Sequence, residues 1–403
     1  MNNNRNYSWW VVIMLWFVAL LNYMDRQVLS TMRPSMQLNI KELESATNFG
    51  YLMAIFLWIY SFMSPISGIL ADKINRKKII VGSLLIWSSV TLLMSFSNNF
   101  SQIFILRAIM GISEAFYLPA ALSLIVDYHD TKNRSLAIGI HMTGLYVGSA
   151  LGGFGATIAF NFSWQHTFFV FGLIGIIYSF ILIVFLKEIR KTPATTIEQN
   201  NLQLDLMSLF KNASFWVLLF YFSIPSLPGW GVKNWLPTLF SENLNIGMEL
   251  AGPISTITIA ASSLIGVVFG GVISDKWVQH HLKGRVYTSA IGLSLTIPAL
   301  IFIGFSHSLF FAIVSAICFG FGYGMFDANN MPILCQIVSS KQRATAYGFM
   351  NMLEVIAGAV ITNILGKSTD DGVLGKSFAI LSICVGIAVL VQLSFLKPKS
   401  VKM

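Results

Sequence analysis

An acidic and a basic residue stand side by side inside the first long apolar stretch of the chain. They are Asp25 and Arg26, within the polar sequence NYMDRQ (22–27), and the apolar stretch extends from about residue 9 to residue 32. A stretch of that length can cross a bilayer as a helix. Charges inside a membrane are costly and usually face a cavity on an ion or substrate pathway. In the alternative interpretation, the pair ends a shorter helix and lies among the lipid headgroups.

A second charged pair lies in the fourth apolar stretch. Arg107 and Glu114 are seven residues apart, so they share one face of a helix. If the first helix runs outward and the fourth inward, Arg107 and Asp25 both lie roughly 10 Å below the outer surface, and Glu114 lies near the midplane. One interpretation is structural, with two ion pairs joining the helices. In the other, Asp25 and Glu114 carry protons, while Arg26 and Arg107 tune these carboxylates and bind an anion.

A lysine follows a group of helix-breaking residues in the seventh apolar stretch. Pro225, Pro228, Gly229 and Gly231 precede Lys233. They predict a broken helix that lines a cavity or gate. Lys233 could hold a carboxylate or phosphate, extend to the outer interface, or form a salt bridge.

Two more acids, Asp327 and Glu354, come from the tenth and eleventh stretches and are expected at one depth. This placement suggests that one is protonated, or that a cation or a lysine lies with them. Nearby polar residues could bind substrate hydroxyls, although helix packing is the alternative. They are Asn234, Asn329, Asn330, Asn351 and Tyr146. Tyr146 lies beside a stripe of glycines at 144, 148 and 152 that predicts close helix packing, so a position in the core is the alternative for this tyrosine.

The composition predicts an all-α membrane protein. Of 403 residues, 55% are hydrophobic and 11% are charged, whereas soluble chains carry about 25% charged residues. The three cysteines suggest neither a disulfide framework nor a metal site. We expect twelve spans, at residues 9–32, 49–71, 79–97, 101–126, 136–160, 165–186, 215–240, 251–274, 286–306, 309–334, 344–366 and 377–396.

The connecting segments predict the domains and the topology. The polar segment 187–212 reads as a cytoplasmic linker between a six-helix bundle at 1–186 and another at 213–403. Most of the 26 lysines and arginines fall at the termini or in loops on one side, which predicts that both termini are cytoplasmic. The formal net charge of +9 is then a topology signal that needs no nucleic-acid partner.

A short motif repeats at the ends of the second and eighth spans. GILADK (68–73) and GVISDK (271–276) both read G-x-x-x-D-K, and the first continues into Asn75 and Arg76. Parallel six-helix repeats organise the major facilitator fold, and the first copy resembles the loop signature of that superfamily, with Asn75 in place of a glycine. The resemblance implies a conformational latch that involves Gly68, Asp72 and Arg76, with Asp275 in the second copy; helix capping by Asp72 is compatible with it.

Motifs in the charged spans narrow the resemblance from the superfamily to particular families within it. NYMDR (22–26), RAIMGISEA (107–115) and WLPT (235–238) resemble the anion:cation symporter family, which includes hexuronate, galactonate and sialic acid carriers. This resemblance implies that Asp25 and Glu114 carry protons, that Arg26 and Arg107 belong to the substrate site or the coupling network, and that Tyr60 contacts substrate. The Spinster lipid transporters share similar segments. His141, the run 144–148 and Lys233 depart from the sugar-acid carriers.

The sequence therefore predicts a monomeric transporter in a bacterial inner membrane that works by alternating access, with its site between the halves. We expect proton-coupled symport of a small organic anion such as a hexuronate or hexonate, with no cofactor beyond the proton and no metal. The alternatives are a Spinster-like exporter of lipids or amphiphiles and a sensor with a transporter fold. No nucleophile–base set or nucleotide-binding loop indicates an enzyme.

Overall fold

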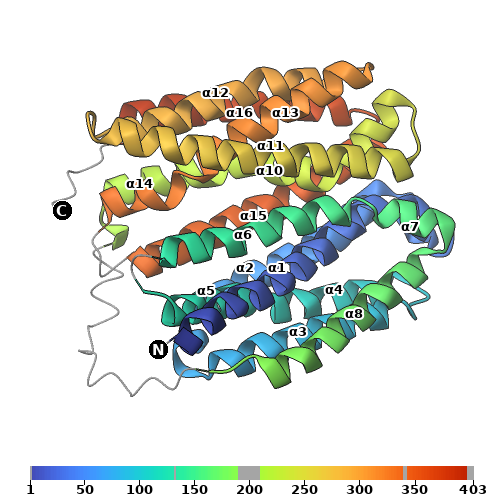
Figure 1. Ribbon diagram of the computed structural model, residues 1–403. Coiled ribbons are helices and arrows are strands. Elements are labelled where there is room, and N and C mark those ends of the chain that lie inside the picture. The colour runs from blue at the N-terminus through green and yellow to red at the C-terminus, as the bar shows by residue number, and fades with distance from the viewer. Residues whose placement is uncertain (1, 131–132, 189–208, 339–342, 397–403) are drawn as a thin grey trace.

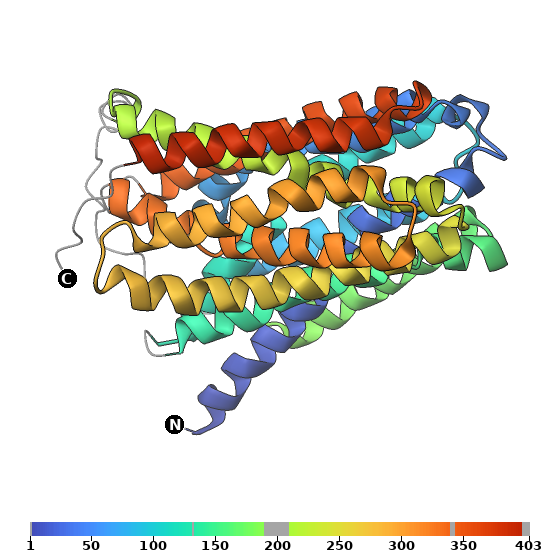
Figure 2. The ribbon, with the colours of Figure 1, turned by 90° about the horizontal axis from the view of Figure 1, so that it is seen from above.

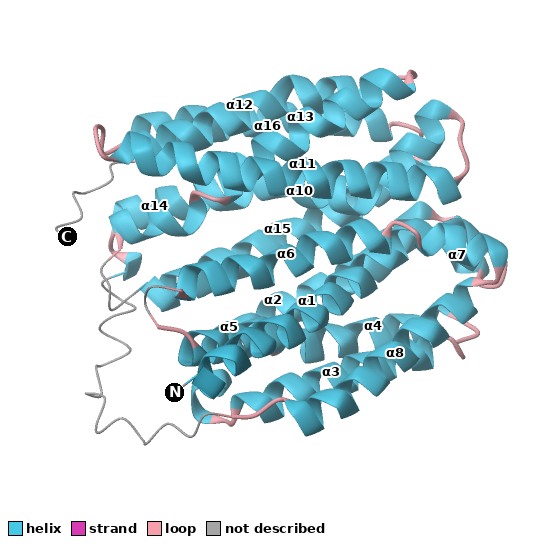
Figure 3. Cartoon of the chain, viewed as in Figure 1, coloured by secondary structure: helices cyan, strands magenta, loops and turns pink. Residues whose placement is uncertain are grey.

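The computed structural model describes residues 2–130, 133–188, 209–338 and 343–396, which fold into helices joined by short loops (Figure 3). Within these residues, twelve helical spans are long and apolar enough to cross a membrane. The predicted number of spans is confirmed. Most of the linker predicted at 187–212 lies outside the described residues.

The N half comprises the helices up to residue 185. Their bounds are α1 Asn2–Met36, the 3-10 helix η1 Lys41–Glu44, α2 Ala46–Lys73, α3 Arg76–Met94, α4 Phe100–Ala115, α5 Tyr117–Tyr128, α6 Arg134–Gly152, α7 Gly155–Asn161 and α8 Trp164–Phe185.

The C half comprises the helices from residue 213 onward. Their bounds are α10 Ala213–Leu244, α11 Met248–Val278, α12 Gly284–Phe305, α13 Leu309–Asp327, α14 Asn330–Ile337, α15 Arg343–Asp370 and α16 Leu374–Phe395.

The two halves lie side by side, and α1, α2 and α6 of the N half meet α10, α11 and α15 of the C half. Figures 1 and 2 place the start of α1 and the end of α16 at the same end of the bundle, with η1 and α7 at the other. We call these ends the termini side and the opposite side.

The breaks in the helices differ from the prediction. The expected break in the seventh span is wrong, because α10 is one helix that contains Pro225, Pro228 and Pro237. The fourth, fifth and tenth spans are interrupted instead, at Phe116, at residues 153–154 and at residues 328–329. A proline removes one backbone donor and leaves a carbonyl without its helical partner, but neighbouring groups in a helical bundle can satisfy that carbonyl.

Close packing between α1 and α6 depends on the glycine stripe, as the sequence predicts. A Cβ on Gly144 would lie 2.7 Å from the carbonyl oxygen of Trp16, and one on Gly148 would overlap the backbone of Leu20. Small residues allow such backbone approach in membranes. The stripe thus brings α6 against the helix that carries Asp25 and Arg26.

Replacing Gly148 by Ala is expected to lower stability by about 1–3 kcal/mol, because the added methyl group forces α6 away from α1. Thermal unfolding of the purified protein in detergent measures the loss. Gly139→Ala is the matched control on the same helix, since a Cβ there meets no atom within 4 Å. Equal melting temperatures for the two variants would contradict this packing role.

Candidate functional site

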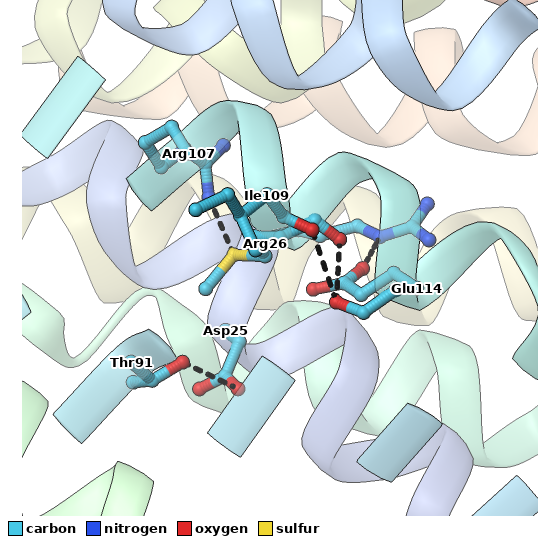
Figure 4. Close-up of polar contacts among 8 residues, drawn as sticks. Asp25, Arg26, Thr91, Arg107, Ile109 and Glu114 are labelled. Atoms are coloured by element: carbon cyan, nitrogen blue, oxygen red, sulfur yellow. Dashed lines mark hydrogen bonds and ion pairs between the residues drawn. The ribbon is translucent and has the colours of Figure 1, made fainter. Parts of the chain in front are cut away.

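The centre of the N half holds a buried ion pair. Arg26 Nε on α1 lies 2.6 Å from Glu114 Oε2 on α4, and the Glu114 side chain is fully buried (Figure 4). Three aromatic rings surround the guanidinium, with centroids 4.6–5.0 Å from its Cζ; they belong to Tyr23, Phe56 and Tyr60. Arginine stacks well on such rings and keeps its charge when buried. The Arg26 side chain retains 12% exposure, so it is accessible from one side.

Asp25 points away from Arg26. Its carboxylate accepts a hydrogen bond from Thr91 Oγ1 on α3 at 3.3 Å, inside the N half (Figure 4). It is 4% exposed. Sequence reasoning placed Asp25 and Glu114 in one network without indicating that Asp25 would face α3. The nearby hydroxyl of Thr91 has no sequence signal that links it to Asp25.

Arg107 is buried but reaches no carboxylate. Its Nη1 contacts Met110 Sδ at 3.1 Å, and its Cζ lies 4.7 Å from the centroid of Phe56. Within the described residues, its side chain forms no ion pair, and its Nε has no hydrogen-bond partner. Of the two ion pairs in the structural interpretation, only Arg26–Glu114 is therefore present.

A hydrogen bond joins α1 to α10 beside this site. Gln27 Nε2 donates to the backbone oxygen of Lys233 at 2.8 Å. Pro237, four residues after Lys233, has no N–H to bond that oxygen within the helix. Pro237 therefore leaves the Lys233 carbonyl free to accept from Gln27. This contact was not predicted from the sequence, although the four-residue spacing between Lys233 and Pro237 is visible there.

A second carbonyl that a proline leaves free is bound by a side chain nearer the opposite side of the bundle. Thr157 Oγ1 on α7 donates to the backbone oxygen of Glu249 on α11 at 2.7 Å. Pro253 follows Glu249 by four residues and lies inside α11. Two prolines in the C half thus each leave a carbonyl that a side chain of the N half binds.

The side chain of Lys233 lies in a cavity between the halves. Its Nζ is 4.8 Å from the centroid of Trp230, and within the described residues it forms no salt bridge. Of the three alternatives for Lys233, the salt bridge is therefore not formed within the described residues. The polar residues that line the cavity are Gln27, Tyr146, Ser149, Lys233, Ser255, Thr256 and Ser263.

Asp327 faces the N half from the end of α13. Tyr146 on α6 donates a hydrogen bond to Asp327 Oδ2 at 3.4 Å, and Asn330 donates to Oδ1 at 3.3 Å. Asp327 is exposed and Glu354 is partly buried. Tyr146 therefore reaches the interface between the halves.

The asparagines divide into two groups. Asn329 donates to the Met325 carbonyl at 2.8 Å within its own chain segment, and Asn234 donates to Thr362 Oγ1 at 2.8 Å within the C half. Both bonds fit helix packing. Asn351 instead donates across the halves to Ser64 Oγ on α2 at 2.9 Å.

The predicted latch residues lie on the termini side. Arg76 forms an ion pair with Asp127 at the end of α5, and the backbone N–H groups of Arg76 and Lys77 donate to the carboxylate of Glu188. Asp275 pairs with Arg285 at 3.1 Å. Gly68 lies in α2 with open space beside it. The Asp72 side chain lies outside the described part of the structure.

A second internal repeat contains Glu114 and Asp327, two acidic residues at the C-terminal ends of helices. GISEA (111–115) and GMFDA (324–328) both read G-x-x-[DE]-A. Glu114 is the next-to-last residue of α4, and Asp327 is the last residue of α13. The interruptions of the fourth and tenth spans thus follow equivalent acids, a signal that sequence reasoning missed.

Comparisons with known proteins agree with this architecture. The family model described as Major Facilitator Superfamily matches residues 15–362. The "Probable galactarate/D-glucarate transporter" of Escherichia coli (strain K12) is 24% identical and aligns with 90% of this chain and 88% of its own length. "Protein spinster homolog 1" of Xenopus laevis is 26% identical, over 92% of this chain and 74% of its own.

A solved structure shares the fold. The inward-facing, unoccupied crystal structure of a bacterial homologue of the human lysosomal transporter Spinster superposes with a TM-score of 0.81 at 20% identity. The superposition covers 98% of this chain and 99% of that one.

Proposed function

Because this chain belongs to the Major Facilitator Superfamily, and is therefore a secondary transporter of small solutes rather than an enzyme, we propose that it carries a small organic anion together with protons. A sugar acid of the hexuronate or hexonate class is the proposed substrate. The similarity to a galactarate/D-glucarate transporter supports this class. Arg26 and Arg107 bind the anion in this proposal, assisted by Lys233, and Tyr60 and Tyr146 contact its hydroxyls, with Asn330 and Asn351.

The Arg26–Glu114 ion pair is the observation that carries the proposal. A substrate carboxylate that binds the partly exposed Arg26 competes with Glu114 for the same guanidinium. An ionised carboxylate that loses its partner in a buried site is costly, so the released Glu114 takes up a proton. Substrate binding and proton binding then favour each other. Asp25, which is buried behind the pair, is the second proposed proton carrier.

The proposed cycle alternates access between two halves, 1–186 and 213–403. The Asn351–Ser64 bond lies toward the termini side, within nine residues of the ends of α15 and α2 there. The other described hydrogen bonds between the halves lie in the middle of the bundle or toward the opposite side. With the likeness to an inward-facing structure, they support a state open toward the termini side. We take that side as cytoplasmic, in a bacterial inner membrane, and propose that Gly68, Asp72, Arg76 and Asp275 act as the latch there.

Charge movement on a solid-supported membrane tests the function. Proteoliposomes are exposed to sugar acids, neutral sugars, organophosphates and lysolipids, with and without an inward proton gradient. A current specific to sugar acids that is lost in Asp25→Asn is expected. If no current appears, an internal pH dye reports electroneutral proton uptake. No sugar-acid signal by either readout would contradict the proposal.

The second candidate is transport of an amphiphile. It is favoured by the similarity to a spinster homologue over 92% of this chain. Binding of lysolipids without any response to sugar acids in the same panel would select it.

A further inference from the structure

One carboxylate joins the two halves at the opposite side. Asp370, the last residue of α15, accepts hydrogen bonds from Ser45 Oγ at 2.8 Å, from the Ala46 N–H at 2.7 Å and from the Thr47 N–H at 2.8 Å. These donors form the start of α2 in the N half. Asp370 therefore satisfies backbone donors that are free at the first turn of every helix.

The two helices that meet at Asp370 have the same length and approach each other closely. Both α2 and α15 contain 28 residues, and the N-terminus of α2 meets the C-terminus of α15. Gly50 and Gly366 allow the backbones to approach, since a Cβ on Gly366 would lie 2.7 Å from the Ala46 carbonyl oxygen. A negative charge at the positive end of the α2 dipole adds attraction to the hydrogen bonds.

The loop that presents α2 is held by an arginine. Arg33 Nε donates to the Leu43 carbonyl at 3.1 Å, and Arg33 Nη2 donates to the Glu44 carbonyl at 2.6 Å. These bonds fix η1 directly before Ser45. The donors that face Asp370 are thus in place before the halves meet.

We propose that Asp370 is a positioning residue that holds the opposite side closed by capping α2 across the two halves. Opening this side separates α15 from α2 and leaves the Ala46 and Thr47 N–H groups without their acceptor. Asp370 takes no part in the cavity with Lys233, so it controls the ratio of the two open states without contacting substrate. This inference rests on alternating access, but not on the proposed substrate or on proton coupling.

The test measures the distance across the opposite side by pulsed electron paramagnetic resonance. Spin labels replace Asn98, after α3, and Ser308, before α13, in a background in which Cys318, Cys335 and Cys384 are serine. Asp370→Asn removes the charge and one acceptor oxygen. We expect the ratio of long to short distances to rise about tenfold, which corresponds to about 1.4 kcal/mol.

The neighbouring Asp371→Asn is the matched control, because both acids are exposed but the Asp371 side chain makes no hydrogen bond to α2 within the described residues. Its distances should equal those of the parent. Coincident distributions for Asp370→Asn and the parent, or equal shifts in both variants, would overturn the proposal.

If Asp370→Asn does not fold, Ser45→Ala removes one of the three bonds and is expected to raise the ratio by a smaller amount. An unchanged ratio in Ser45→Ala would then overturn the proposal. Neither readout needs substrate or a proton gradient, so failure of the proposed function is recognised separately, by the absence of transport.

Discussion

Replacing Glu114 by Gln is expected to abolish accumulation driven by a proton gradient while preserving exchange of substrate across the membrane. Glutamine can still accept a hydrogen bond from Arg26, but it cannot bind and release a proton. With a pH difference of one unit, one coupled proton supports about a tenfold accumulation, because one unit corresponds to about 1.4 kcal/mol. The variant should fall to simple equilibration.

The measurement is uptake of labelled substrate into proteoliposomes, with counterflow as the companion assay. Glu42→Gln is the control, since Glu42 is exposed in η1, at the opposite side and outside the helices that form the ion pair. Full gradient-driven accumulation in Glu114→Gln would remove Glu114 from the coupling mechanism. Loss of counterflow as well would instead indicate that the carboxylate is needed for substrate binding or for folding.

Arg26→Gln is expected to have two separable effects. It leaves the fully buried Glu114 carboxylate without its counter-charge, and breaking a buried pair in this way costs about 3–5 kcal/mol. It also removes the proposed anion-binding guanidinium. Affinity for the substrate should fall roughly 10- to 100-fold, the range expected for a lost charge-assisted hydrogen bond.

The double variant Arg26→Gln/Glu114→Gln separates the two effects. With both charges absent, thermal stability should return toward that of the parent, while substrate binding stays weak. Melting temperatures in detergent and binding titrations with the sugar acid found in the transport assay report the two quantities. Parental affinity in the stable double variant would show that Arg26 does not bind the anion.

Much of the fold could be predicted from the sequence, because the local patterns that encode it are strong. Apolar segments longer than about 20 residues give the spans, and the repeated G-x-x-x-D-K gives the internal symmetry. Pro225 and Pro228 misled the prediction, because α10 continues through both of them. A third proline of this helix shows how a neighbouring helix can compensate. Pro237 interrupts the hydrogen-bonding pattern, but Gln27 from α1 satisfies the freed carbonyl.

The charged residues of the candidate site could be listed from the sequence, but their partners could not. Depth along the helices predicted that Asp25 and Arg107 would lie at one level, with Glu114 near the midplane. Whether Glu114 meets Arg26 or Arg107 depends on the rotation of α1 against α4, which no local pattern specifies. The contact between Asp370 and α2 spans more than 300 residues of sequence and follows only from how the halves meet.

The carbonyls of Lys233 and Glu249, which Pro237 and Pro253 leave without helical donors, also bear on the route that opens at the opposite side. When the halves separate there, Gln27 and Thr157 withdraw and both oxygens lose their only described side-chain donors. Lipid tails cannot replace these bonds, whereas water can. The opened passage is therefore expected to be hydrated down to the level of Lys233, which suits a polar solute that arrives from water better than one that enters sideways from the bilayer.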